Sequence, residues 1–158
     1  MSGMTGIPEP RYQYCDGGRA AAGFPPLTDA VRGDCVTRGI AIAARLEYEQ
    51  ARQLLDKVGC TAQDWSEHPI TYTDADDGLQ IAVVRRVLES ELGWEYHDLY
   101  TQPTFELDRL PMGSVVVMLA SQPHLCAVVD RVLYDTYDST EGGQATLFSY
   151  WTPPPPTG

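Results

Sequence analysis

The sequence predicts an α+β fold, in which helices from the first part of the chain pack on an antiparallel sheet formed by the last part. Two patterns in the 158 residues indicate this division. Between residues 35 and 93, apolar side chains recur at the three- and four-residue spacing of a helix. After residue 93, short apolar runs alternate with turn signals such as "LPMG" and "STEGG", which is typical of neighbouring antiparallel strands.

Three helices are expected in the first part of the chain. The first begins at Cys35, with Asp34 as its N-cap and with Val36 and Ile40 on its buried face. The second runs through "LEYEQARQLLDKVG" and ends at Gly59. The third runs through "GLQIAVVRRVLESELG" and carries an apolar stripe made of Ile81, Val84, Leu88 and Leu92.

Five strands are expected in "WEYHDLY", "SVVVMLA", "HLCAVVD", "VLYDTY" and "TLFSYW". Residues 1–33 are rich in Gly, Pro and Ala, so they are expected to form an irregular N-terminal arm rather than a strand. Residues 153–158 form a Pro-rich tail. Residues 1–152 are therefore predicted to make one domain, which suits a chain of this length.

Charge and hydropathy exclude several partners. The formal net charge is −11, from 11 basic and 22 acidic residues, and such an acidic protein is repelled by nucleic acid and by anionic lipid. The first ten residues lack the features of a signal peptide, and the run "SVVVMLA" is too short to span a bilayer. A cytoplasmic protein that binds neither nucleic acid nor membrane is expected, and in that compartment its four cysteines are thiols.

Cys35 is the candidate nucleophile among these thiols. The first turn of a helix directs backbone N–H groups and the positive end of the helix dipole at the sulfur, which favours the thiolate. Asp34 opposes this effect, because a neighbouring carboxylate disfavours a second negative charge. The hypothesis predicts an accessible Cys35 and a buried Cys126, and the alternative interpretation is that Cys35 only fills the core.

His124 is the candidate general base, because it opens a strand whose hairpin partner carries carboxylates. If the chain turns at Asp130 and Arg131, His124 shares a face of the hairpin with Asp135. A turn longer by one residue would favour Asp138 instead, so the register decides which carboxylate orients the imidazole. His68 and His97 are interpreted as ordinary surface histidines.

Two stretches together resemble the papain-like cysteine peptidase superfamily: "GDCVTRGIAIA" and, much later, "HLCAVVDRVLYDTYD". With "DGGRAAAGF", "LESELGW" and the terminal "YW", the chain is also similar to small uncharacterised bacterial and bacteriophage proteins over roughly residues 16 to 151. The resemblance implies a papain-like fold with Cys35 as nucleophile, His124 as general base and Asp135 as the residue that fixes the imidazole. The glutamine that this superfamily usually supplies as an oxyanion donor is missing before Cys35, which leaves Gln13, Thr28 and Arg32 as candidates.

These residues predict a cysteine-dependent hydrolase or acyl transferase that attacks an amide, isopeptide or thioester carbonyl of a peptide or protein substrate. No cofactor is implied. A metal site made of Cys35, Cys126 and His124 is less favoured than the triad, because the closely spaced ligand pairs typical of zinc sites are absent. The alternative function is a catalytically inactive papain-like module that binds a phage or host protein, or a structural component of a phage particle, which would make the protein virion-associated.

Overall fold

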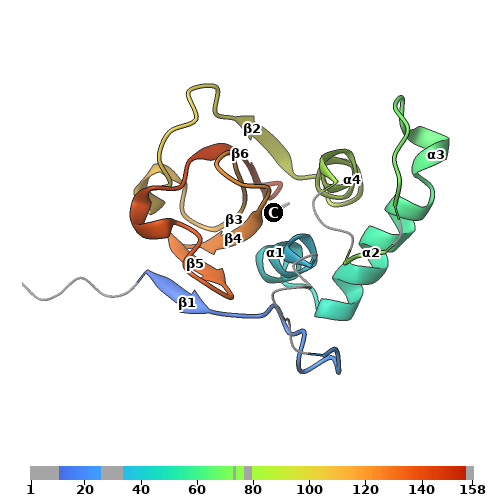
Figure 1. Cartoon of the computed structure of the whole chain (residues 1–158), viewed down its shortest axis with the longest axis horizontal. Helices are drawn as coiled ribbons and strands as arrows, with labels where there is room; N and C mark the ends of the chain where they lie inside the picture. The colour runs from blue at the N-terminus through green and yellow to red at the C-terminus, as the bar shows by residue number, and fades with distance from the viewer. Residues whose placement is uncertain (1–10, 26–33, 73, 77–79, 156–158) are drawn as a thin grey trace, which may run out of the picture.

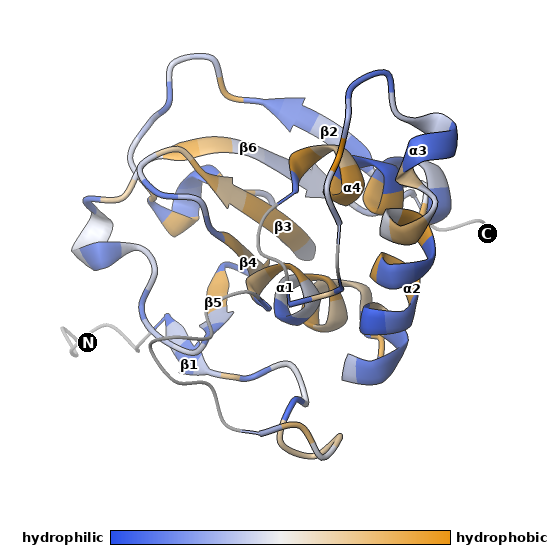
Figure 2. Cartoon of the chain, turned by 45° about the vertical axis from the view of Figure 1, so that its right-hand side comes forward, coloured by the Kyte–Doolittle hydropathy of each residue, from blue (hydrophilic) through white to orange (hydrophobic). Residues whose placement is uncertain are grey.

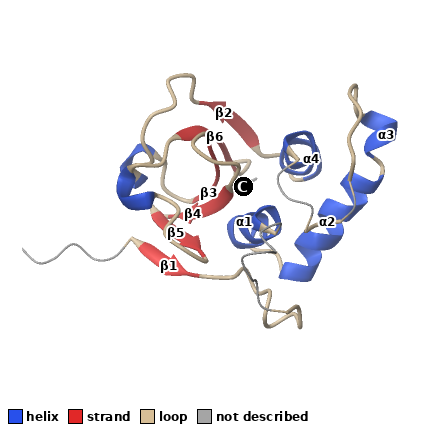
Figure 3. Cartoon of the chain, in the orientation of Figure 1, coloured by secondary structure: helices blue, strands red, loops and turns tan. Residues whose placement is uncertain are grey.

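The computed structural model describes residues 11–25, 34–72, 74–76 and 80–155. Its helical elements are α1 (Cys35–Ala44), α2 (Tyr48–Cys60), α3 (Ala62–Trp65), α4 (Ile81–Arg85), the π-helical turn η1 (Arg86–Glu91) and the 3-10 turns η2 (Leu107–Arg109) and η3 (Glu141–Gly143). Its strands are β1 (Tyr12–Tyr14), β2 (Glu95–Asp98), β3 (Ser114–Leu119), β4 (Leu125–Val129), β5 (Val132–Asp135) and β6 (Leu147–Thr152). Figure 3 shows the longer helices on one side of the strands.

The predicted α+β character is confirmed. Helices α1 and α2 occupy the stretches expected for them, and β2 to β6 coincide with the five expected strands. The short helix α3 was not expected, because its four residues lie in a segment rich in Thr, Asp and Ser. Within the described ranges, no helix combines the length and the apolar character needed to cross a membrane.

The sheet has six strands in the order β1-β5-β4-β3-β6-β2. All neighbours are antiparallel except β1, which runs parallel to β5 at one edge. The expectation that residues 1–33 form only an irregular arm is therefore wrong for Tyr12–Tyr14, whereas residues 1–10 and 26–33 lie outside the described part. Three residues without an apolar alternation give no strand signal, and β1 forms because its backbone can pair with the edge of β5.

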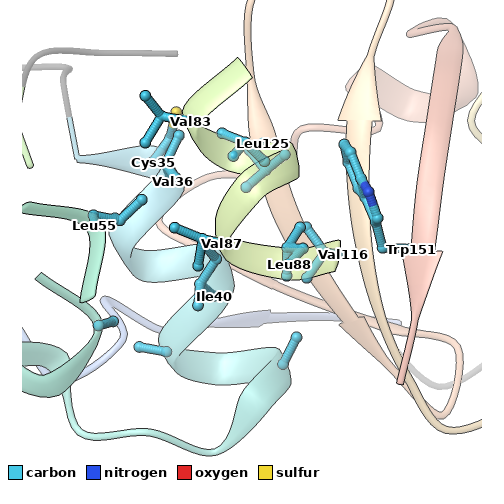
Figure 4. Packing of buried hydrophobic residues seen from close by; sticks show 14 of the residues in the cluster. Cys35, Val36, Ile40, Leu55, Val83, Val87, Leu88, Val116, Leu125 and Trp151 are labelled. Carbon is cyan, nitrogen blue, oxygen red and sulfur yellow. The ribbon is translucent and has the colours of Figure 1, made fainter. Parts of the chain in front are cut away.

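The helices cover one face of the sheet, and a second apolar cluster fills the other face. Figure 1 shows the sheet strongly curved, with α1 and α4 beside it and α2 on the outer side of these two helices. Figure 2 shows apolar residues concentrated on β3 and β4, while α2 is largely polar. The cluster between helices and sheet, seen in Figure 4, includes Val36, Ile40, Leu55, Val87, Leu88, Val116, Leu125 and Trp151. The opposite cluster includes Phe105, Leu110, Val115, Val117, Cys126, Val128, Leu133 and Leu147.

The buried stripe of the third predicted helix differs from the expected one. The α-helical turn of α4 passes directly into the wider turns of η1, which changes the angle between successive side chains. Ile81, at the first position of α4, is 42% exposed. The residues of this segment that enter the core are Val83, Val84, Val87 and Leu88.

Helix α1 approaches β4 closely at Gly39. A Cβ atom at this position would lie 3.4 Å from Leu125 Cδ2 and 3.5 Å from the carbonyl carbon of Cys126. These are van der Waals distances, so α1 lies directly against the backbone of β4 at this position. Since Cys35 lies one turn before Gly39 and His124 directly precedes β4, this contact brings the two candidate residues to the same end of the helix–strand interface.

Candidate active site

Cys35 is the first residue of α1, as predicted. The free N–H groups and the positive dipole end of this first turn lie close to the sulfur. The side chain is only 4% exposed and belongs to the cluster between helices and sheet. The expectation of an accessible sulfur is therefore wrong, because α1 lies so close to β4 that its first turn is drawn into the core.

Strands β4 and β5 form the two-residue hairpin on which the orienting residue depends. Val129 pairs with Val132, and the turn residues Asp130 and Arg131 have φ angles of 50° and 63°. Positive φ at both central positions is the geometry of a type I′ turn, which matches the twist of the strands. The register that favours Asp135 is confirmed.

This register places His124 beside Asp135. His124 Nε2 lies 2.7 Å from Asp135 Oδ2, and both side chains are buried. The alternative carboxylate, Asp138, is exposed and accepts hydrogen bonds from the backbone N–H and the hydroxyl of Thr140. The structure therefore brings His124 together with Asp135 and leaves Asp138 in a turn.

The Asp135 carboxylate is held from four sides. Besides His124, its partners are the Ser139 hydroxyl at 2.9 Å, the backbone N–H of Thr136 at 2.7 Å and Arg38 Nη2 at 3.4 Å. Burial raises the pKa of Asp135, but hydrogen bonding and charge from His124, together with the charge of Arg38, outweigh that effect and hold the pKa below its usual value. An ionised, oriented carboxylate is the result.

His124 is protonated near neutral pH. Burial lowers its pKa, but the hydrogen bond with Asp135, the proximity of Cys35 and the negative charge of Asp135 raise the pKa to about 9. Because an ionised carboxylate only accepts hydrogen bonds, Nε2 is the nitrogen that donates to Asp135. Nδ1 is the nitrogen left for Cys35, and the effect of Cys35 on the His124 pKa places the cysteine close to the imidazole.

Tyr137 and Gln122 lie next to this unit. The Tyr137 ring packs against the His124 imidazole, with ring centroids 5.2 Å apart, and its hydroxyl accepts a hydrogen bond from Gln122 Nε2 at 3.0 Å. Tyr137 is 41% exposed whereas His124 is 6% exposed, so the tyrosine limits the access of water to the imidazole. Gln122 stands two positions before His124, but no motif marks it in the sequence, and its link to the site is the hydrogen bond to Tyr137.

Asp34 is fully buried and occupies the N-cap position of α1 as predicted, but its side chain makes no capping hydrogen bond. Its carboxylate instead accepts hydrogen bonds from the Tyr48 hydroxyl at 2.7 Å and Arg19 Nη1 at 3.1 Å, and it forms an ion pair with Arg38. Two guanidinium groups thus compensate its charge. The expected opposition of Asp34 to a Cys35 thiolate is therefore offset.

The candidates for an oxyanion donor before Cys35 gain no support. Gln13 lies exposed on β1, and its amide donates to the carbonyl oxygen of Tyr14 at 3.4 Å. Thr28 and Arg32 fall outside the described residues. Backbone N–H groups at the start of α1 are the donors closest in sequence to the sulfur.

The remaining histidines and Cys126 have ordinary environments. His68 is exposed, and His97 stacks on Tyr150 and shares a hydrogen bond with Thr152. Cys126 is buried as predicted, and burial raises its thiol pKa well above the usual value. Over the residues that the structure describes, no three His, Cys, Asp or Glu side chains are grouped so that they could hold a metal ion.

Comparison of the chain with family models, with curated proteins and with solved structures gave no match. Its function is therefore inferred from the geometry of the site.

The raised pKa of His124 predicts how stability changes with pH. A group whose pKa is higher in the folded state stabilises the fold fully below its unfolded pKa, here 6.5, and loses that contribution as pH rises through the folded value of about 9. We expect the free energy of unfolding to fall by on the order of 3 kcal/mol over this range, as the shift of the His124 pKa implies. Urea unfolding at a series of pH values measures it.

His124→Gln should remove most of this decline, whereas His97→Gln, at a histidine on the sheet edge, should keep it. A wild-type unfolding free energy that stays level or increases between these pH values would contradict the protonated state assigned to His124.

Proposed function

We propose that the chain is a cysteine-dependent hydrolase or acyl transferase of papain-like architecture, with Cys35, His124 and Asp135 as its catalytic triad. One observation carries the proposal. Asp135 accepts a hydrogen bond from His124 Nε2 at 2.7 Å inside the protein, and the cysteine at the start of α1 lies close enough to His124 to raise its pKa. A nucleophile, a base and a residue that orients the base are the three parts that acyl transfer through a thiol requires.

The reaction follows from the protonation states. With the proton on His124, the Cys35 thiolate attacks the carbonyl carbon of an amide, isopeptide or thioester and forms a new carbon–sulfur bond. The imidazolium donates its Nδ1 proton to the leaving amine or thiol as the bond to that group breaks. The neutral imidazole then takes a proton from water, or from an acceptor amine, which attacks the thioester and releases Cys35. Asp135 keeps Nδ1 directed at the sulfur throughout.

The negative charge that develops on the carbonyl oxygen needs donors near Cys35. Backbone N–H groups in the first turn of α1 have no acceptor within the helix, so they suit this role. Gln122, two residues before His124, carries a side-chain amide that can donate a hydrogen bond. Its present bond to the Tyr137 hydroxyl is weak enough to be exchanged for a bond to substrate.

One observation favours the alternative of a catalytically inactive binding module. Cys35 is 4% exposed, and a substrate carbonyl cannot reach a sulfur that is covered in this way unless neighbouring residues move. The alternative therefore predicts a Cys35 that stays unmodified in the presence of reactive acyl donors.

An aryl thioester of an acetylated amino acid distinguishes the two. After brief incubation near neutral pH and an acid quench, peptide mass spectrometry should find the acyl group on Cys35 ahead of Cys60, although Cys60 is the exposed thiol. His124→Gln should lose this preference, whereas His68→Gln, at an exposed histidine far along the chain from the site, should keep it. Acylation of Cys60 with Cys35 unmodified would support the binding module.

A further inference from the structure

Buried groups of alternating charge form a continuous chain beneath the site. Arg19 Nη1 lies 3.1 Å from Asp34 Oδ2, the other oxygen of Asp34 pairs with Arg38 Nη1, and Arg38 Nη2 lies 3.4 Å from Asp135 Oδ1. Asp135 then contacts His124. Each of these side chains is at most 8% exposed, so the charges interact with little screening by solvent.

Arg38 is the link between the two ends of the site. It follows Cys35 by one helical turn, and its guanidinium contacts both the carboxylate next to Cys35 and the carboxylate that holds His124. Burial lowers the pKa of Arg38, but the charges of Asp34 and Asp135 outweigh this and raise it, so the guanidinium stays charged. Its Nε has no hydrogen-bond partner in the described part of the chain, a cost that a purely structural ion pair would avoid.

The loop that contains "DGGRAAAGF" supports this arrangement from the other side. Gly17, with φ of 72°, lies against the backbone of Arg38, where an added Cβ would come within 3.0 Å of the Arg38 Cα. Arg19 from the same loop neutralises Asp34 and donates from Nε to the carbonyl oxygen of Pro25 at 2.8 Å. The loop therefore has a physical role: its Arg19 is the last cation of the buried chain of charges and pairs with Asp34 at the start of α1.

We propose that Arg38 is a positioning residue that balances the charge of Asp34 beside Cys35 and holds Asp135 in place under His124. The guanidinium fork suits this role because it can donate to two carboxylates at once, whereas an ammonium acts as a single point charge. The inference deepens the proposed function, on which it rests for the role of Cys35 as nucleophile.

The titratable and charged groups that face the site come from several elements. They are Asp34, Cys35 and Arg38 at the start of α1, Arg19 beside Asp34, His124 before β4, Asp135 on β5 with Tyr12 beside it, and Tyr137 after β5. Arg38 is the cation among them that contacts both Asp34 and Asp135, so its removal is expected to change the charge balance of the site most directly.

The test follows thiolate formation at Cys35 by its ultraviolet absorbance, taken as the difference between each variant and the same variant carrying Cys35→Ala. This measurement needs no substrate and no reagent access to the sulfur. Arg38→Met should move the midpoint of thiolate formation upward by about one pH unit, which is a modest estimate for a nearby unit charge at a dielectric constant of about 20. Arg38→Lys should restore most of that shift, because it keeps the charge.

Arg85→Met is the control. Arg85 pairs with Glu89 within the α4–η1 segment, so its replacement should leave the midpoint of Cys35 thiolate formation unchanged. If Arg38→Met does not fold, the same comparison is made between Asp34→Asn and Asp34→Asn/Arg38→Met, in which no uncompensated Asp34 charge remains. A folded Arg38→Met, alone or in that background, with a midpoint no different from its parent would overturn the proposal. A wild-type protein that leaves Cys35 unacylated by the thioester, while Arg38→Met still shifts the midpoint, would instead count against the proposed function.

Discussion

Replacing Cys35 with Ala is expected to abolish turnover of the aryl thioester, by roughly 10⁴-fold or more, because no covalent intermediate can form without the sulfur. The substitution removes one heavy atom from a buried position, so it should cost only about 1 kcal/mol of stability. Release of the aryl thiol, followed by its absorbance, measures turnover, and urea unfolding measures stability in the same preparation.

Cys126→Ala is the matched control for this loss. Cys126 is also buried, at 2% exposure, but its neighbours lie in the apolar cluster on the opposite face of the sheet. The Cys126→Ala variant should therefore lose about as much stability as Cys35→Ala and keep its turnover of the thioester. Equal activity in wild type and a folded Cys35→Ala would refute the role of Cys35 as nucleophile.

Replacing Asp135 with Asn should lower turnover by roughly 10² to 10⁴-fold, the range known for the orienting acid of a catalytic triad. The loss of the carboxylate removes the main cause of the raised pKa of His124, so that pKa should move from about 9 back toward 6.5. The imidazole is then largely neutral at pH 8, and the thiolate loses its partner. NMR titration of the His124 ring measures the shift directly.

Asp138→Asn tests whether the effect belongs to this one carboxylate. Asp138 is exposed and bonds only within its own turn, to Thr140. Its replacement should leave both turnover and the His124 titration near their wild-type values. A larger loss for Asp138→Asn than for Asp135→Asn would mean that His124 exchanges its partner in solution.

The parts of the site that follow from local rules could be predicted from the sequence. A helix start at Cys35 follows from the apolar spacing after "RGD", and the pairing of His124 with Asp135 follows from a two-residue turn and the alternation of side chains along a strand. Asp130 and Arg131 are not the usual residues for that turn, which is why Asp138 remained an alternative until the register was observed.

The parts that depend on distant contacts could not be predicted. Arg38 and Asp135 are 97 positions apart, so nothing in either local sequence indicates their ion pair. The burial of Cys35 depends on the close approach of α1 to β4, and the strand at Tyr12–Tyr14 depends on a free edge of β5. In each case a tertiary contact overrides a weak local preference.

The parallel pairing of β1 with β5 joins the start of the chain to a strand that is made late. Tyr12 donates from its hydroxyl to the carbonyl oxygen of Asp135, and the backbone N–H of Cys15 donates to the same oxygen, across more than a hundred residues of chain. At roughly 5–20 residues per second, a ribosome needs roughly 5–20 s to extend the chain from the end of α1 to Asp135. During that time Cys35 has neither His124 nor Asp135 as a partner, so the nascent chain carries an ordinary thiol. The catalytic triad proposed here can therefore assemble only when the last strands of the sheet are in place.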